Sequence, residues 1–214
     1  MNTLARTCVV IPMKNPADSK QRLRPALNSQ QRSELAVQMF INTLEFFRRK
    51  FPSLCVVVVT PSAHIASLTL GHQHQVLLES RPRGLNKAVE HATEWSLQRG
   101  FRRQLIIPAD IAELSQQEIR HILNALPVGD GVIIAAAKDG GTNALLCSPP
   151  DAIPFCFGTA SARAHQLQAE AQGYACEVLE LPKLGTDIDQ PEDLLPLLTD
   201  FYQQAGTAEV VNYG

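Results

Sequence analysis

The sequence predicts an α/β fold: a three-layer α/β/α sandwich in which helices cover both faces of a mainly parallel sheet. Residues 54–60 and 105–107 form continuous apolar runs, the pattern of strands that are buried on both faces. Such runs alternate with segments of helical periodicity from residue 8 to about residue 130, which is typical of a doubly wound parallel sheet. We expect about seven strands in one domain, 1–205, followed by a loose polar tail, 206–214.

The composition is ordinary for a globular protein. Of the 214 residues, 45% are hydrophobic and 19% are charged, and the formal net charge is −2. This balance lacks the basic surface that nucleic acids or acidic membranes attract, so we expect neither partner. The five cysteines form no C-x-x-C motif, which favours reduced thiols in a cytoplasmic protein. Because Pro12 and Lys14 break the short apolar start, we expect no signal peptide.

The first half of the chain supplies strands and helices in alternation. We expect strands at 8–13, 54–60 and 75–79. A helix runs from a capping box at Asn28 and Gln31 to about residue 50, with an apolar stripe made of Ala36, Phe40, Leu44 and Phe47. A short helix follows Pro61. Another helix begins at Gly84 and ends near Gly100, and its buried side is made of Leu85, Ala88, Val89 and Ala92.

The second half begins with the segment 104–110, a buried strand that ends at Pro108. Ser115 and Glu118 form a second capping box, which starts a helix that runs to about residue 126. The paired glycines of the turn 138–143 predict a small antiparallel insertion, with strands at 131–137 and 144–147. We then expect a helix over 160–172, a strand over 176–181 and a helix that starts at Pro191.

Charged side chains follow two of these strands. Lys14, Lys20 and Arg22 lie after the first strand, where such cations suit a polyphosphate; a solvated basic loop is the alternative. Asp110 follows the strand at 105–107 and belongs to the same sheet edge, where α/β sheets bind ligands; a helix N-cap is the alternative. The first strand is followed by neither a P-loop nor G-x-G-x-x-G, so we expect no dinucleotide fold.

Two carboxylates near the end of the chain, Asp187 and Asp189, are two residues apart. In an extended segment they point to the same side and repel unless a cation lies between them. Mg²⁺ prefers such oxygen ligands together with substrate phosphates. The alternative is an acidic loop that caps the final helix.

Three further segments offer polar groups at strand-to-helix junctions or turns. Gly158 to Ser161 at the head of a helix predict an anion site, to which Thr142 adds a hydroxyl; a plain N-cap is the alternative for Ser161. Asn86 either hydrogen-bonds a ribose or base edge or caps its helix. His165 fits a surface or satisfied histidine better than a catalyst. Together, the basic loop, the carboxylates and the anion site indicate nucleotidyl transfer, in which catalysis is positioning plus charge neutralisation.

The order of these motifs resembles the CofC/FbiD family, guanylyltransferases of deazaflavin coenzyme F-420 biosynthesis. The matching segments span nearly the whole chain: 11–14 with 20–23, 84–88, 108–110, 139–145, 157–165 and 187–194. One departure is Thr159-Ala160, where the family often has Pro-Gly. This change puts the acceptor preference most in question.

The resemblance implies a GT-A-like nucleotidyltransferase fold of the nucleotide-diphospho-sugar transferase type. It implies transfer of GMP from GTP to 2-phospho-L-lactate, phosphoenolpyruvate or 3-phospho-D-glycerate, with release of pyrophosphate. The catalytic residues would be Lys14, Lys20, Arg22 and Asp110, and two Mg²⁺ ions would be held by Asp110, Asp187 and Asp189. Nucleotide contacts would come from Pro12, Lys14, Lys20, Arg22, Gly84, Leu85 and Asn86. The acceptor would be held by Thr142, Asn143, Gly158 and Ser161.

The resemblance names two small-molecule partners, GTP and a phosphorylated acid, and the next enzyme of the coenzyme pathway as the acceptor of the product. It leaves a homodimer open. Three alternatives stand beside it: another GT-A-like nucleotidyltransferase, a glycosyltransferase that uses Asp187-Ile188-Asp189 as its D-x-D, and a non-catalytic nucleotide-binding module. The basic loop favours nucleotidyl transfer, because a glycosyltransferase need not hold a triphosphate there.

Overall fold

A computed structural model describes residues 3–126, 129–185, 188 and 191–194, and within them one seven-stranded sheet has the order β3-β2-β1-β4-β6-β5-β7. The strands are β1 (Thr7–Pro12), β2 (Cys55–Thr60), β3 (Gln75–Leu78), β4 (Arg103–Ile106), β5 (Gly131–Ala136), β6 (Thr142–Ser148) and β7 (Ala175–Glu180). The helices are α1 (Ser29–Lys50), α2 (Ala63–Gly71), α3 (Leu85–Gln98), α4 (Gln116–Ala125) and α5 (Ser161–Ala171). Short 3₁₀ segments are η1 (Thr3–Arg6), η2 (Pro16–Asp18), η3 (Gln21–Leu23) and η4 (Pro191–Asp193).

The sheet is parallel except at β6, which runs antiparallel to both β4 and β5. The pairs β1–β2, β1–β4, β2–β3 and β5–β7 are all parallel. The predicted mainly parallel sheet with an antiparallel insertion is therefore confirmed. Because β1 to β4 run in one direction, their carboxyl ends meet at one edge of the sheet.

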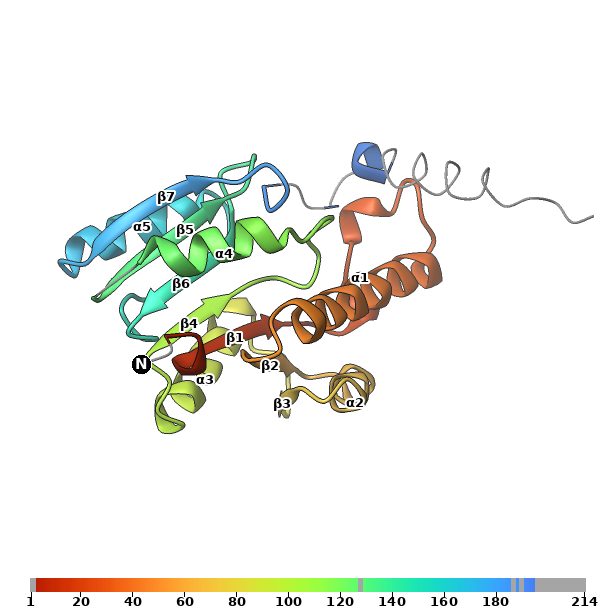
Figure 1. Cartoon of the computed structure of the whole chain (residues 1–214). Coiled ribbons are helices and arrows are strands. Elements are labelled where there is room, and N and C mark those ends of the chain that lie inside the picture. The colour runs from red at the N-terminus through yellow and green to blue at the C-terminus, as the bar shows by residue number, and fades with distance from the viewer. Residues whose placement is uncertain (1–2, 127–128, 186–187, 189–190, 195–214) are drawn as a thin grey trace, which may run out of the picture.

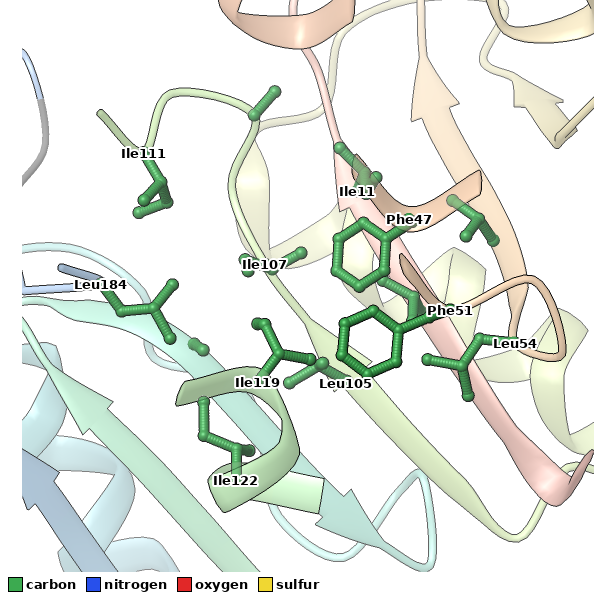
Figure 2. Close-up of a cluster of buried hydrophobic side chains, with 14 of the residues drawn as sticks. Ile11, Phe47, Phe51, Leu54, Leu105, Ile107, Ile111, Ile119, Ile122 and Leu184 are labelled. Atoms are coloured by element: carbon green, nitrogen blue, oxygen red, sulfur yellow. The ribbon is translucent and has the colours of Figure 1, made fainter. Parts of the chain in front are cut away.

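Helices cover both faces of the sheet and complete the three layers (Figure 1). The side chains of β1 alternate between two cores: Val9 and Ile11 face the side of α1 and α4, and Val10 faces the side of α3 and α5. Figure 2 shows the first of these cores, where Phe47 and Phe51 lie against the strands and Ile119 of α4 packs toward Leu184. The sheet lies between these two cores.

The predicted elements agree with the structure to within a few residues, with one error in the predicted core. The capping box of α1 is present, since Asn28 accepts from the Gln31 N–H and the Gln31 side chain accepts from the Asn28 N–H. Leu85 was expected on the buried side of α3 but is 44% exposed. It is the first residue of that helix and lines a cleft instead of the core.

The second predicted capping box is half wrong. Ser115 caps α4 by accepting from the Glu118 N–H, as expected. The Glu118 carboxylate does not return to Ser115: its oxygens accept from the Lys183 N–H at 3.0 Å and the Leu184 N–H at 2.8 Å. Glu118 therefore fastens the turn after β7 to α4.

No described helix is long and apolar enough to cross a membrane. All five cysteines are free thiols, as expected. Pro191–Asp193 form the 3₁₀ segment η4, while the rest of the helix expected from Pro191 and the predicted tail, 206–214, lie outside the described residues.

We expect Glu118→Gln to lower the free energy of unfolding by about 1–3 kcal/mol, because the amide can accept only one of the two N–H groups and leaves the other unsatisfied. Urea unfolding measures the change. The matched control is Glu113→Gln, which removes only an exposed ion pair with Lys183 and should cost at most about 1 kcal/mol. Equal changes in the free energy of unfolding for the two variants would show that the Glu118 hydrogen bonds contribute no more stability than the exposed ion pair does.

Candidate active site

A cleft of about 600 Å³ lies at the carboxyl ends of β1, β2, β3 and β4. Its walls come from the last residues of the strands, from the residues that follow them and from the start of α3. They include Pro12, Met13, Lys14, Val59, Pro61, Glu79, Gly84, Leu85, Ala88, Pro108, Ala109 and Asp110. The basic loop adds Lys20 and Arg22. The structure thus brings the predicted basic loop, the start of α3 and Asp110 into one cavity.

The basic loop is held against the end of β4 by an ion pair. Lys20 Nζ lies 2.8 Å from Asp110 Oδ2, and the Lys20 side chain is 2% exposed against 41% for that of Asp110. Lys20 reaches this position from a left-handed backbone conformation (φ 53°) just before η3. The buried ammonium and the carboxylate therefore form an ion pair in the wall of the cleft.

Two alternatives for these residues are wrong. The N-cap of α4 is Ser115, so Asp110 is not a helix cap. The basic loop is not merely solvated, because Lys14, Lys20 and Arg22 all line the cleft and Lys20 is buried in it. Their contacts with a substrate stay predictions.

Asp187 and Asp189 lie outside the described residues, so the three-aspartate magnesium site stays a prediction. Among the described residues, no three His, Cys, Asp or Glu side chains are grouped to hold a metal ion. Ile188 between the two aspartates is buried against Leu23 and Met39. Since Leu23 belongs to η3, this contact places Ile188 next to the basic loop.

The turn at residues 183–185 is held by hydrogen bonds to both backbone groups of Leu184. The Leu184 N–H is held by Glu118, and the Leu184 carbonyl accepts from Asn143 Nδ2 at 2.8 Å. Asn143 was predicted to contact the acceptor; the structure shows its amide donating to this turn. Direct contact with the acceptor stays a prediction.

The predicted anion site contains a buried chain of three polar side chains. Ser161 Oγ donates to Thr142 Oγ1 at 2.9 Å, and Thr142 Oγ1 lies 3.1 Å from His165 Nδ1. His165 Nε2 accepts from the Cys156 N–H at 2.9 Å, so Nδ1 carries the ring proton and donates to Thr142. Thr142 Oγ1 thus accepts two hydrogen bonds, and its own proton is left to donate to another group.

Burial lowers the pKa of His165 to about 4, so the ring is neutral at pH 7. The interpretation of His165 as a satisfied histidine is confirmed. Ser161 is not a plain N-cap, because Ala160 holds that position and no side chain caps α5. Ala160 adopts the left-handed conformation (φ 53°), which glycine reaches without steric cost. This is the second residue of the Thr159-Ala160 departure from the family's Pro-Gly.

Gly158 and Asn86 are joined to one another through Phe157. Asn86 Oδ1 accepts from the Phe157 N–H at 2.8 Å, and Asn86 Nδ2 donates to the Phe157 carbonyl at 3.3 Å. Asn86 is not the helix cap, since Gly84 is the N-cap of α3. Gly158, exposed and at φ 143°, follows the residue that Asn86 holds. The predicted contacts of Asn86 with the nucleotide and of Gly158 with the acceptor stay predictions.

Sequence reasoning missed the positioning residues Glu118 and His165. The Ser-x-x-Glu pattern pointed to a local contact, whereas the carboxylate of Glu118 has partners 65 and 66 residues away. His165 stands four residues after Ser161, on the same face of α5, and that spacing was the signal that could have paired them.

We expect His165 to make the protein less stable in acid. Its folded pKa of about 4 lies below the ordinary 6.5, so the unfolded chain binds more protons between these values. Stability is then full above pH 6.5 and is lost as the pH falls toward 4, by up to about 3 kcal/mol.

Urea unfolding between pH 7 and pH 4 tests this for the wild type, His165→Gln and the exposed control His91→Gln. Only His165→Gln should flatten the pH dependence. If His165→Gln leaves the pH dependence of stability unchanged, that dependence comes from other titratable groups.

Comparison with known proteins supports the resemblance to the guanylyltransferase family over most of the chain. The family model "Guanylyl transferase CofC like" matches residues 7–206. A 3-phospho-D-glycerate guanylyltransferase from Colwellia psychrerythraea is 47% identical over 88% of this chain and 90% of its own length. A phosphoenolpyruvate guanylyltransferase from Sphaerobacter thermophilus is 30% identical over 88% and 90%. A 2-phospho-L-lactate guanylyltransferase from Methanothermobacter thermautotrophicus is 29% identical over 88% and 82%.

Solved structures agree on the fold. A nucleotidyl transferase from Methanothermobacter superposes with a TM-score of 0.65 at 13% identity, over 92% of this chain and 98% of that one. A 4-diphosphocytidyl-2C-methyl-D-erythritol synthase from Anaerococcus prevotii gives 0.61 at 11% identity, over 95% and 99%. The fold is thus the predicted nucleotidyltransferase fold, and the glycosyltransferase and binding-module alternatives have no support among these relatives. By the family model and its relatives, the chain belongs to the CofC-like guanylyltransferases.

Proposed function

We propose that the protein transfers GMP from GTP to the phosphate of 3-phospho-D-glycerate, with Mg²⁺, in coenzyme F-420 biosynthesis. The observation that carries the proposal is the Lys20–Asp110 ion pair, which gathers a basic loop and a carboxylate at one end of a nucleotide-sized cleft. The relative at 47% identity acts on 3-phospho-D-glycerate, and those near 30% include enzymes for phosphoenolpyruvate. The choice of 3-phospho-D-glycerate as the acceptor rests on that difference in sequence identity.

In the proposed reaction an oxygen of the acceptor phosphate attacks the α-phosphorus of GTP. A new phosphoanhydride bond forms there, the bond from the α-phosphorus to the bridging oxygen breaks, and pyrophosphate leaves with that oxygen. Lys14, Lys20 and Arg22 balance the charge of the triphosphate and of the leaving pyrophosphate. No covalent intermediate with the protein is needed.

The residues present fit a magnesium ion. Asp110 supplies a partly exposed carboxylate oxygen in the cleft, and Ile188, the residue between the two other aspartates in the sequence, is buried against Leu23 next to the basic loop. Carboxylates together with substrate phosphates are the ligands that Mg²⁺ prefers. Asp110, Asp187 and Asp189 would hold the ion, which would supply charge neutralisation at the reacting phosphates.

The acceptor is itself an anion, and the polar chain at α5 suits it. Because Ser161 and His165 both donate to Thr142 Oγ1 in the arrangement inferred above, the Thr142 hydroxyl would be left to donate to a phosphate or carboxylate oxygen. Ser161 and the exposed backbone at Gly158 lie at the same helix start. These three residues would orient the acceptor phosphate for attack.

Pyrophosphate release tests the reaction. With GTP and Mg²⁺ present, we expect 3-phospho-D-glycerate to give the fastest release, with phosphoenolpyruvate and 2-phospho-L-lactate slower. Each acid is assayed singly and with the next pathway enzyme, which draws off the product. Failure of all three acids would reject the assignment, and a faster second acid would replace the proposed acceptor.

We expect Asp110→Asn and Asp187→Asn each to lower kcat by roughly 100-fold or more, the scale of removing one preorganised charge-stabilising group. Asp151→Asn is the control, because this exposed residue lies outside the cleft lining. Circular dichroism checks that each variant folds. Full activity of Asp187→Asn would place the metal elsewhere.

A further inference from the structure

We propose that Glu79 reads the guanine base and selects GTP over ATP. The proposal rests on the proposed function and deepens it, because the cleft has a charged end for the triphosphate and a second end, near Leu85, where no charged group has yet been assigned to the base. Glu79 is the carboxylate at that second end.

Position separates Glu79 from the phosphate groups. It directly follows β3, an edge strand, and lines the same cleft as Asp110. The order β3-β2-β1-β4 places three strand spacings between the two strand ends, about 14 Å across the sheet. A nucleotide with its triphosphate at Lys20 and Asp110 therefore reaches β2 and β3 with its base.

The walls near Glu79 suit a flat base. Val59 near the end of β2 and Pro61 just after it form one wall, and Pro82 and Leu85 close the side of α3. The exposure of Leu85, which was unexpected for a helix core position, is explained if its side chain covers a base. Apolar walls with one well-placed charged group are the usual makeup of a small-molecule site.

The backbone of Glu79 is held by a hydrogen bond, but its carboxylate has no bonding partner among the described residues. Its backbone N–H donates to the Thr60 carbonyl at 2.9 Å, which extends the ladder between β2 and β3 to this residue. Within the part of the chain that the structure describes, no hydrogen bond or ion pair involves the Glu79 carboxylate or the neighbouring Arg83 guanidinium. Both charged groups line the cleft, and both are available to a ligand.

The chemistry matches guanine and opposes adenine. Guanine presents two donors side by side, N1–H and the 2-amino group, and an ionised carboxylate is acceptor-only with two oxygens, so it can take both. Adenine presents an unprotonated N1 at the corresponding place, and a carboxylate there meets a lone pair without a proton. Arg83 offers donors that suit the guanine O6 carbonyl.

Nucleotide binding by calorimetry, with Mg²⁺, tests the proposal with GTP, ITP and ATP. ITP keeps N1–H but lacks the 2-amino group. We expect the wild type to prefer GTP over ITP by roughly 10-fold or more, and Glu79→Gln to bind GTP roughly 10- to 100-fold more weakly, the scale of hydrogen bonds to a charged group.

The amide of Glu79→Gln should also reverse the selectivity, because it can donate to adenine N1 and accept from the 6-amino group. We expect its ATP affinity to rise relative to GTP and its GTP-over-ITP preference to disappear. Glu79→Ala should lose the preference without gaining ATP. Glu180→Gln, at the exposed end of β7 and outside the cleft lining, is the matched control and should behave as the wild type does.

Unchanged selectivity in Glu79→Gln, or an equal loss for all three nucleotides, would overturn the proposal while wild-type GTP binding and pyrophosphate release leave the proposed function intact. A wild type that binds none of the three nucleotides would overturn both.

Discussion

The ion pair between Lys20 and Asp110 is the interaction on which the cleft depends. It joins the loop after β1 to the loop after β4, across the two central parallel strands. An almost fully buried ammonium is costly without a partner, so the pair commits the basic loop to one position over the strand ends. The left-handed backbone at Lys20 is a second local cost that the pair offsets. With one cation held in this way, Lys14 and Arg22 line the same cavity.

The fold was predictable because its signals are local. Strand runs such as residues 54–60, the capping box at Asn28 and the glycine turn at 138–143 each determine a nearby element, and parallel order follows from their alternation. The same logic predicted that Lys20 and Asp110, 90 residues apart, would share one sheet edge. It failed for Leu85, because helical spacing shows which side of a helix is apolar but not how far the sheet beneath it extends.

The finer parts of the site were not predictable, because their partners are remote in sequence. The amide of Asn143 looked suited to a ligand, yet it donates to the carbonyl of Leu184, which is 41 residues away. The tautomer of His165 depends on one backbone N–H in the loop at Cys156. Motif patterns identified Thr142 and Ser161 as polar groups, but only the structure shows that the start of α5 meets the start of β6 and that the two hydroxyls are joined.

The two hydrogen bonds between Asn86 and Phe157 connect the substrate ends of the proposed site. Asn86 is two residues from Gly84 in the cleft wall, and the Phe157 ring packs edge-on against His165 with centroids 4.8 Å apart. A ligand that moved the start of α3 would therefore also move the loop before α5. Linkage of this kind is reciprocal, so each of two ligands coupled in this way would alter the affinity of the other by the same factor. The Asn86–Phe157 contact would thus carry any coupling between the two proposed substrates through the protein itself.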